Sequence, residues 1–166
     1  QNISHQHEGA YTGEISARMA AEFCTHVIVG HSERRAYYSE TDELINLKIK
    51  AAQGWGLIPV VCVGERLEQR ESGMTASVIS SQLKGALSDV EPVDPAKIVI
   101  AYEPIWAIGS GQSASALETN QLIAQVIRPT LEGLWGNETA QRVRVLYGGS
   151  VNPKNANSFF NQTEID

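Results

Sequence analysis

The sequence predicts an α/β fold in which parallel strands alternate with helices. Four short apolar runs, each followed by a polar or glycine-containing cluster, lie at residues 26–30, 57–64, 97–102 and 143–149. Their near-continuous apolar character is typical of strands that are covered on both faces of a parallel sheet. Segments with helical spacing of apolar residues separate these runs, which indicates successive βαβ units.

The helical segments are expected, in chain order, at about 12–23, 42–53, 75–87 and 117–135. Apolar side chains recur on one face of each segment, as Val78, Ile79 and Leu83 do in the third. Pro129 lies inside the fourth segment and should bend it. A short further helix should follow Pro153, because proline suits the first position of a helix.

Two architectures fit this alternation, an open doubly wound sheet and a (β/α)8 barrel. The dinucleotide fingerprint of many open sheets is absent, because the glycines at 109 and 111 lack a third partner and follow a loop. The four runs end in reactive or glycine residues, namely His31, Glu65, Glu103 and the turn at 148–150. Sites assembled from the carboxyl ends of several strands are typical of barrels, so the sequence favours the barrel.

Length and composition narrow the functional classes. The 166 residues suffice for one domain with a core, and we treat 1–166 as a single domain. The net charge of −6 argues against a nucleic-acid-binding surface, so local donors must hold any anionic ligand. Cys24 and Cys62 lack metal-type spacing, which favours a reduced, cytoplasmic protein without a metal site. The sequence contains neither a membrane-length apolar run nor a signal peptide.

Glu103 is the leading candidate for catalysis. It separates an apolar strand from a loop whose apolar tip, residues 106–108, is bounded by Gly109 and Gly111, and Pro104 fixes the chain direction after it. A carboxylate beneath an apolar flap is suited to proton abstraction with water excluded. A helix cap or an ion pair is the alternative, but the bulky loop favours the catalytic interpretation.

His31 and the turn at 147–151 are the second and third candidates. Ser32 and Glu33 resemble the opening of a short helix, so His31 should stay neutral and donate a hydrogen bond. A purely structural histidine fits equally well. The glycine turn exposes backbone N–H groups that could hold a phosphate, although such turns are common.

Two other clusters are less informative. The run at 65–71 has mixed charges and is most simply a solvated helix face. His5, His7 and Glu8 lie on a polar stretch without a second cluster, so no zinc site is expected.

Five motifs together resemble the triosephosphate isomerase family, in that family's order. They are GAYTGE (9–14), GHSERR (30–35), PVVCVGE (59–65), AYEPIWAIGSG (101–111) and YGGSV (147–151). The similarity covers essentially all 166 residues. It implies an incomplete (β/α)8 TIM barrel that contains strands 4–7 with their helices. Strands 1 and 2, most of strand 3, and strand 8 would be missing, as the abrupt ends at Gln1 and Asp166 also suggest.

The resemblance also implies an activity. The family interconverts dihydroxyacetone phosphate and D-glyceraldehyde 3-phosphate through an enediol(ate), in glycolysis and gluconeogenesis, without a cofactor. Glu103 matches the base, and His31 matches the neutral group that polarises the carbonyl. The substrate-binding positions are Gly109, Gly148, Gly149 and Ser150. The lid corresponds to Pro104, Ile105, Trp106, Ala107, Ile108, Gly109, Ser110 and Gly111.

The family is homodimeric, and Thr12, Glu14 and Arg34 match its subunit contact. One departure is small, because Ser110 replaces the usual threonine of the lid. The larger departure is the missing strand 1, because that strand carries the family's catalytic lysine and its asparagine neighbour. We therefore expect the 166 residues alone to be inactive and prone to association. Another barrel enzyme that acts on a phosphorylated sugar and a catalytically silent partial barrel are the alternatives.

Overall fold

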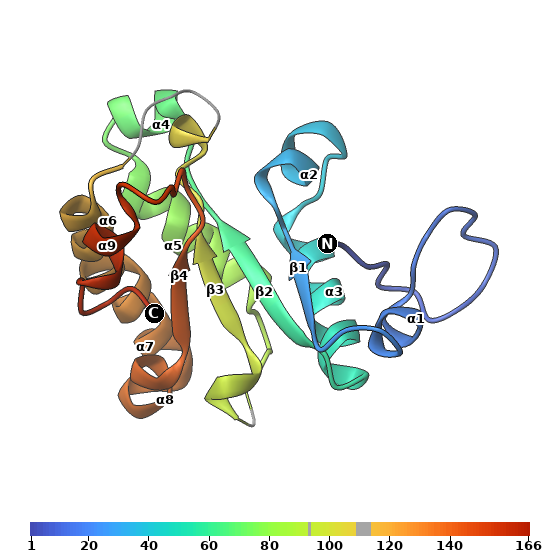
Figure 1. Ribbon diagram of the computed structural model, residues 1–166. Coiled ribbons are helices and arrows are strands. Elements are labelled where there is room, and N and C mark those ends of the chain that lie inside the picture. The colour runs from blue at the N-terminus through green and yellow to red at the C-terminus, as the bar shows by residue number, and fades with distance from the viewer. Residues whose placement is uncertain (93, 109–113) are drawn as a thin grey trace.

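The computed structural model describes residues 1–92, 94–108 and 114–166, and its described strands form one parallel sheet (Figure 1). The strands are β1 (His26–Val29), β2 (Ile58–Val63), β3 (Val99–Tyr102) and β4 (Arg144–Tyr147), adjacent in chain order. Val29 pairs with Val61, and Tyr102 pairs with both Val63 and Tyr147. An open doubly wound sheet reverses its strand order, whereas a barrel wall does not. The predicted strands and the barrel-type order are confirmed.

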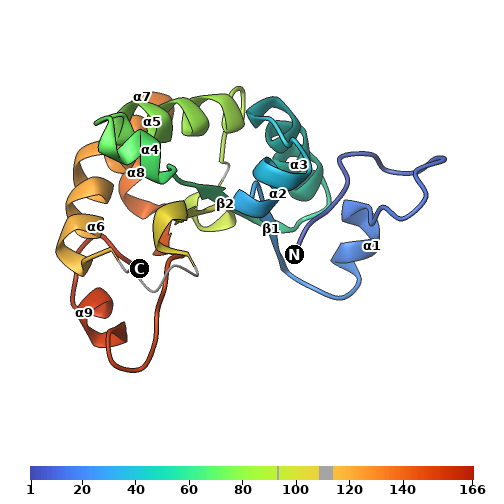
Figure 2. The ribbon, with the colours of Figure 1, turned by 90° about the horizontal axis from the view of Figure 1, so that it is seen from above.

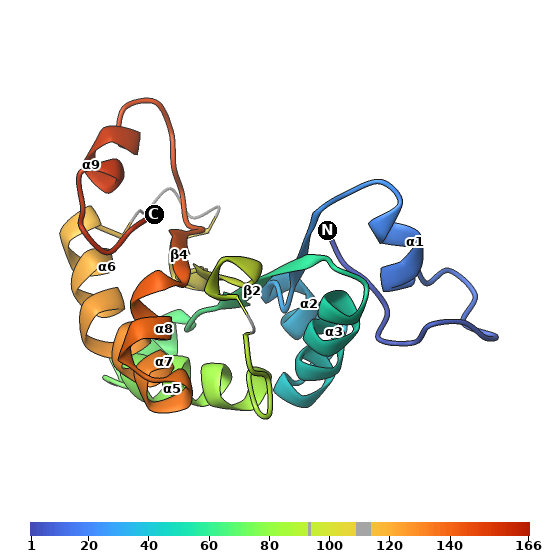
Figure 3. The same ribbon diagram turned by 90° about the horizontal axis from the view of Figure 1, so that it is seen from below.

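Helices precede, connect and follow the strands. They are α1 (Ala17–Ala21), α2 (Ser32–Tyr37), α3 (Asp42–Gly54), α4 (Leu67–Glu71), α5 (Thr75–Ala86), α6 (Ala116–Leu122), α7 (Arg128–Trp135), α8 (Asn137–Arg142) and α9 (Ala156–Phe160). Helices α3, α5 and α7 lie on the same side of the sheet, as views from above and below both show (Figures 2 and 3). In the described part of the chain, no helix combines the length and the apolar character needed to cross a membrane.

Local sequence explains where several helices begin. The Thr41 hydroxyl accepts a hydrogen bond from the Leu44 N–H at 3.3 Å and caps α3. Ser115 and Glu118 form a reciprocal capping box at the start of α6. The helix predicted at 12–23 is shorter than expected, because Ser16 caps α1 and Gly13 adopts a positive φ of 93° in the preceding turn.

The long helix predicted at 117–135 is interrupted. A π-helical turn, Ile123–Ile127, joins α6 to α7, whose second residue is Pro129. Proline has no N–H to donate to the preceding turn, which accounts for the widened turn at this place. Helix α8 was not predicted, and Gly136 separates it from α7 with a φ of 80°. Helix α9 begins three residues after Pro153, so Pro153 is not its first residue.

The core lies between the sheet and its helices. Val29, Val61, Ile100 and Val145, one from each strand, are completely buried. They belong to one apolar cluster with side chains of α3, α5 and α7, including Ile45, Ile49, Ile79, Leu83 and Leu131. Burial of strands and inner helix faces together is the expected organisation of a barrel wall.

The two edges of the sheet differ. In the described residues, no strand pairs with the edge of β1 that faces away from β2. At the opposite edge, the Asp166 N–H donates to the Val145 carbonyl at 3.0 Å. The Val145 N–H donates in turn to the Asp166 carboxylate at 2.8 Å. The described strands therefore form one parallel segment of a barrel wall, as predicted.

Candidate active site

His31 and Glu103 meet at the carboxyl end of the sheet. His31 directly follows Gly30 at the end of β1, and Glu103 directly follows β3. The His31 Nε2 atom lies 3.4 Å from the Glu103 Oε1 atom. Because β2 separates these two strands, only the tertiary fold brings the side chains together. The sequence predicted both residues, and the structure places them side by side.

Helix α2 orients the His31 ring. The Glu33 N–H donates to the His31 Nδ1 atom at 3.2 Å, so the imidazole caps the short helix that the sequence predicted. A neutral ring that accepts at Nδ1 carries its proton on Nε2. The Nε2–H group therefore points toward Glu103, while the side chain remains 30% exposed.

The Glu103 carboxylate is buried and has few partners. The residue is 7% exposed, and the Ser32 N–H donates to its Oε2 atom at 3.4 Å. Burial raises the pKa of Glu103, although His31 and hydrogen bonds from the Cys62 thiol and Ser32 oppose this. A carboxylate with a raised pKa is a stronger base when ionised, which suits proton abstraction.

Cys62 is a neighbour of Glu103 that sequence reasoning did not identify. Its side chain is buried, and burial together with the nearby Glu103 raises the pKa of the thiol. The thiol therefore stays protonated and can donate to the carboxylate. The signal that could have identified Cys62 is its position near the end of β2, the strand that lies between β1 and β3.

Glu65 corrects the prediction that residues 65–71 form a solvated helix face. The residue is completely buried, and α4 begins only at Leu67. The Tyr102 hydroxyl donates to its carboxylate at 3.1 and 3.2 Å, and the Trp106 indole N–H donates at 2.8 Å. These two donors, which flank Glu103 in the sequence, explain why a carboxylate is tolerated in this interior.

Gly148 makes room for the catalytic candidate. A Cβ atom at this position would lie 2.8 Å from the Glu103 Cγ atom, and the Gly148 N–H donates to the Tyr102 carbonyl at 2.8 Å. At Gly149, a Cβ atom would lie 2.2 Å from the Tyr147 hydroxyl oxygen. The Ser150 carbonyl accepts from the Asn155 side chain at 3.0 Å. The glycine turn thus lies against Glu103.

The predicted lid is described only in its first part. Ile105–Ala107 form a 3₁₀ turn after Pro104, and Ala107 is buried. Ile108 is 36% exposed. The three remaining lid residues, Gly109, Ser110 and Gly111, lie outside the described residues. Hydrogen bonding of Trp106 to Glu65 ties the described part to the end of β2.

The predicted subunit-contact residues lie in two places. Thr12 and Glu14 are exposed on the N-terminal loop, which extends away from the sheet (Figure 1). Arg34 on α2 pairs with Glu40 at 2.5 Å, and its guanidinium lies over the Tyr38 ring.

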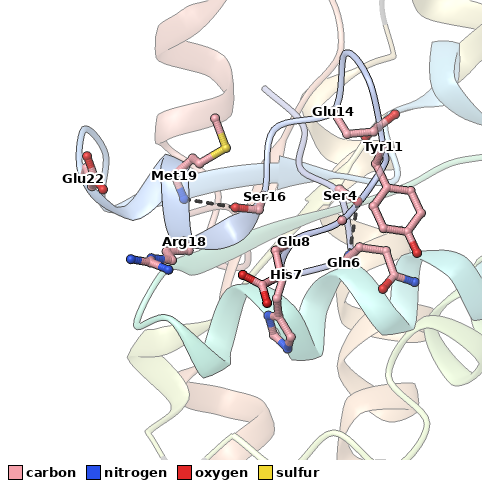
Figure 4. Close-up of a pocket in the computed structure, with 11 residues that line it drawn as sticks. Ser4, Gln6, His7, Glu8, Tyr11, Glu14, Ser16, Arg18, Met19 and Glu22 are labelled. Atoms are coloured by element: carbon pink, nitrogen blue, oxygen red, sulfur yellow. Dashed lines mark hydrogen bonds between the residues drawn. The ribbon is translucent and has the colours of Figure 1, made fainter.

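Two hollows lie near the N-terminal segment. One of about 400 Å³ is lined by residues from Ser4 to Glu22, including Tyr11 and Glu14, and contains neither His31 nor Glu103 (Figure 4). A second, of about 450 Å³, reaches His31. In the described residues, no group of three or more histidine, cysteine or acidic side chains is placed to share a metal ion.

Comparisons with known proteins agree with this geometry. A family model described as triosephosphate isomerase matches residues 1–166. The chain is 52% identical to the triosephosphate isomerase of Dictyoglomus thermophilum and 50% identical to that of Dictyoglomus turgidum, and it covers 67% of each. It is 52% identical to the triosephosphate isomerase of Dehalococcoides mccartyi strain CBDB1, of which it covers 64%. All of this chain is aligned in each case, so it spans about two thirds of these relatives' length.

Proposed function

Because the chain belongs to the triosephosphate isomerase family, we propose that it supplies the base and the electrophile of a triose phosphate isomerase. The reaction is the interconversion of dihydroxyacetone phosphate and D-glyceraldehyde 3-phosphate. The observation that carries the proposal is the 3.4 Å approach of His31 Nε2 to Glu103 Oε1 at the carboxyl end of the sheet. This division of roles is the one known for the family.

Glu103 acts as the base. In its ionised form the carboxylate takes a proton from the carbon next to the substrate carbonyl, which leaves an enediolate. It then returns the proton to the neighbouring carbon, so that the carbonyl and the hydroxyl exchange places and no atom is gained or lost. Burial of Glu103 supports this role, since a poorly solvated carboxylate competes well for a carbon-bound proton.

His31 acts on the substrate oxygens. Its Nε2–H donates a hydrogen bond to the carbonyl oxygen, where negative charge develops as the proton leaves carbon. The Nδ1 acceptor bond from the Glu33 N–H supports this assignment, because it fixes which nitrogen carries the proton. The imidazole can then move a proton between the two oxygens of the enediol(ate).

Phosphate binding is assigned to backbone groups. We propose that the N–H groups of Gly109 and Ser150 hold the phosphate, with Gly148 and Gly149 giving the ligand close access to the turn. The net charge of −6 supports a local cradle, because the overall field does not attract an anion. The lid, Pro104 to Gly111, would close over the bound substrate and exclude water.

Assembly and location are inferred from the family to which the chain belongs. We propose a homodimer in which Thr12, Glu14 and Arg34 contribute to the subunit contact. The exposed positions of Thr12 and Glu14 on a loop that extends from the sheet support this. We also propose a cytoplasmic enzyme of glycolysis and gluconeogenesis, with which the free thiols of Cys24 and Cys62 agree.

The activity needs more than these 166 residues. We propose that the family's lysine, which stabilises the substrate and the developing charge, comes from the remaining third of the relatives' length. Loss of one such electrostatic contact typically costs ~3–4 kcal/mol of transition-state stabilisation. "Full-length enzyme" below means the protein in which residues 1–166 are joined to the segments that complete its relatives.

One assay tests the proposal. The full-length enzyme, its Glu103→Gln variant and the 166-residue chain alone are compared for isomerisation of dihydroxyacetone phosphate. We expect robust turnover by the full-length enzyme, a fall of roughly 10²- to 10⁴-fold or more in the variant, and essentially none in the short chain. Glu138→Gln, at an exposed glutamate of α8, is the matched control and should keep full activity. Near-normal turnover of Glu103→Gln would remove Glu103 from its role.

A further inference from the structure

Gln82 on α5 makes two hydrogen bonds to the backbone of a single residue. The Gly64 N–H donates to Gln82 Oε1 at 2.8 Å, and Gln82 Nε2 donates to the Gly64 carbonyl at 3.0 Å. Gly64 is buried and directly follows β2, whereas Gln82 is half-buried. One side chain thus satisfies both polar groups of a buried peptide segment.

The sheet itself does not supply these bonds. The last registered pair of β1 and β2 is Val29 with Val61, so on the β1 side Gly64 lies three residues beyond the paired region, whereas on the β3 side pairing continues to Val63 with Tyr102. Buried backbone groups require partners, and the glutamine amide can both donate and accept, as the backbone of a neighbouring strand does. Gln82 therefore supplies the two hydrogen bonds that a neighbouring strand would otherwise make to Gly64 at the carboxyl end of the sheet.

The backbone of Gly64 contacts the backbone of Glu103. A Cβ atom on Gly64 would lie 1.7 Å from the Glu103 carbonyl oxygen, so the two backbones are in direct contact. The Glu103 N–H donates to the Val63 carbonyl at 2.8 Å. The main chain from which the carboxylate projects is thus held against the segment that Gln82 clamps.

We propose that Gln82 is a positioning residue for Glu103, which it holds in place through the backbone of Gly64. The inference rests on the proposed function, because it concerns the base of that reaction. Gln82 does not touch the reacting atoms. Its two bonds keep Gly64 from shifting, and the Glu103 carboxylate therefore keeps its 3.4 Å approach to His31. Misplacement of a catalytic group by about 1 Å can cost roughly 100-fold in rate.

Two variants of the full-length enzyme test the clamp. Gln82→Leu keeps the size of the side chain but removes both bonds, and Gln82→Glu keeps only the acceptor for the Gly64 N–H. We expect kcat to fall roughly 10- to 100-fold in Gln82→Leu and less in Gln82→Glu, with KM within about twofold of the parent value. Gln141→Leu, the same change on the exposed face of α8, is the matched control and should leave both constants unchanged.

The pH profile separates positioning from mere stability. Groups that face Glu103 are His31 after β1, Arg35 on α2 and the Cys62 thiol of β2, and each opposes the rise in the pKa of Glu103 that burial causes. A loosened main chain admits water to the carboxylate, so this pKa should fall. The acidic limb of kcat/KM should then move to lower pH in Gln82→Leu. Carbon-13 NMR of the Glu103 carboxyl measures the same shift without turnover.

The outcomes are distinct. A lower melting temperature with unchanged kcat and an unchanged Glu103 titration would overturn the inference. Should Gln82→Leu fail to fold, Gln82→Glu decides, since a fall in kcat supports the clamp and an unchanged kcat refutes it. If the unsubstituted full-length enzyme shows no isomerase activity, the proposed function fails. The carboxyl titration of the variants then still supports or refutes the role of Gln82.

Discussion

Substitution of Gly148 by alanine offers a sharp test of how Glu103 is positioned. A Cβ atom at Gly148 would lie 2.8 Å from the Glu103 Cγ atom and 3.5 Å from its Oε1 atom. Favourable carbon–carbon contacts are ~3.5–4.0 Å, so the two groups must separate by about 1 Å. Gly148 does not have a positive φ, so alanine brings no backbone strain of that kind.

The expected effect is on the chemical step. A displacement of about 1 Å of the base should lower kcat of the full-length enzyme roughly 100-fold, equivalent to about 2.7 kcal/mol of activation free energy. The assay is steady-state isomerisation of dihydroxyacetone phosphate, with kcat and KM determined separately. Because Gly148 is also proposed to lie near the phosphate, a rise in KM can accompany the loss.

A matched glycine provides the control. Gly133 lies in α7, and a Cβ atom there would have no neighbour within 4 Å. Gly133→Ala should leave turnover unchanged and stabilise the helix by about 0.5–1 kcal/mol. The reasoning is refuted if Gly148→Ala raises KM alone and leaves kcat at the parent value, because the base would then not have been displaced.

Two further predictions concern stability. Burial raises the pKa of Glu40, but hydrogen bonds from Lys48 and Arg34 outweigh this effect and hold the pKa below its ordinary value. The stability that Glu40 contributes should therefore be lost as pH falls from the ordinary carboxyl pKa through the lowered value. Glu40→Gln would leave the charge of the buried Lys48 uncompensated and should lower the unfolding free energy, measured in urea, by about 3–5 kcal/mol. The control Glu138→Gln, at an exposed position, should lower it by roughly 0.5 kcal/mol or less. Similar losses for both variants would contradict the stabilising role of Glu40. For Glu103 the sign is reversed: burial raises its folded-state pKa, so the fold should lose stability as pH rises from the ordinary carboxyl pKa through the raised value. Glu103→Gln should therefore raise the unfolding free energy at pH 7 by about 1 kcal/mol, and a clear loss of stability would contradict the burial argument.

Periodicity and strand-end chemistry were sufficient to predict the sheet. The four apolar runs became β1 to β4, and the residues that follow β1 and β3 meet at one edge. This succeeded because a parallel βαβ plan brings the carboxyl ends of its strands together. Helix lengths were predicted less well where a cap or a proline intervened, as at Ser16 and Pro129.

Contacts between distant segments could not be predicted from the sequence. Glu65 stands in a charged run, yet donors from Tyr102 and Trp106 hold it completely buried. Gln82 looks like any polar residue of an amphipathic helix, and only the fold shows that it bonds to Gly64. Local sequence cannot reveal such partners, because they lie 18 or more residues away in the chain.

The central claim is that Glu103 takes a proton from substrate carbon with the assistance of His31. The most direct measurement is deuterium incorporation into carbon when the full-length enzyme is incubated with dihydroxyacetone phosphate in heavy water, followed by proton NMR. We expect rapid labelling by the parent enzyme and a rate lower by roughly 10²- to 10⁴-fold in Glu103→Gln. Labelling by Glu103→Gln at the parent rate would contradict the account.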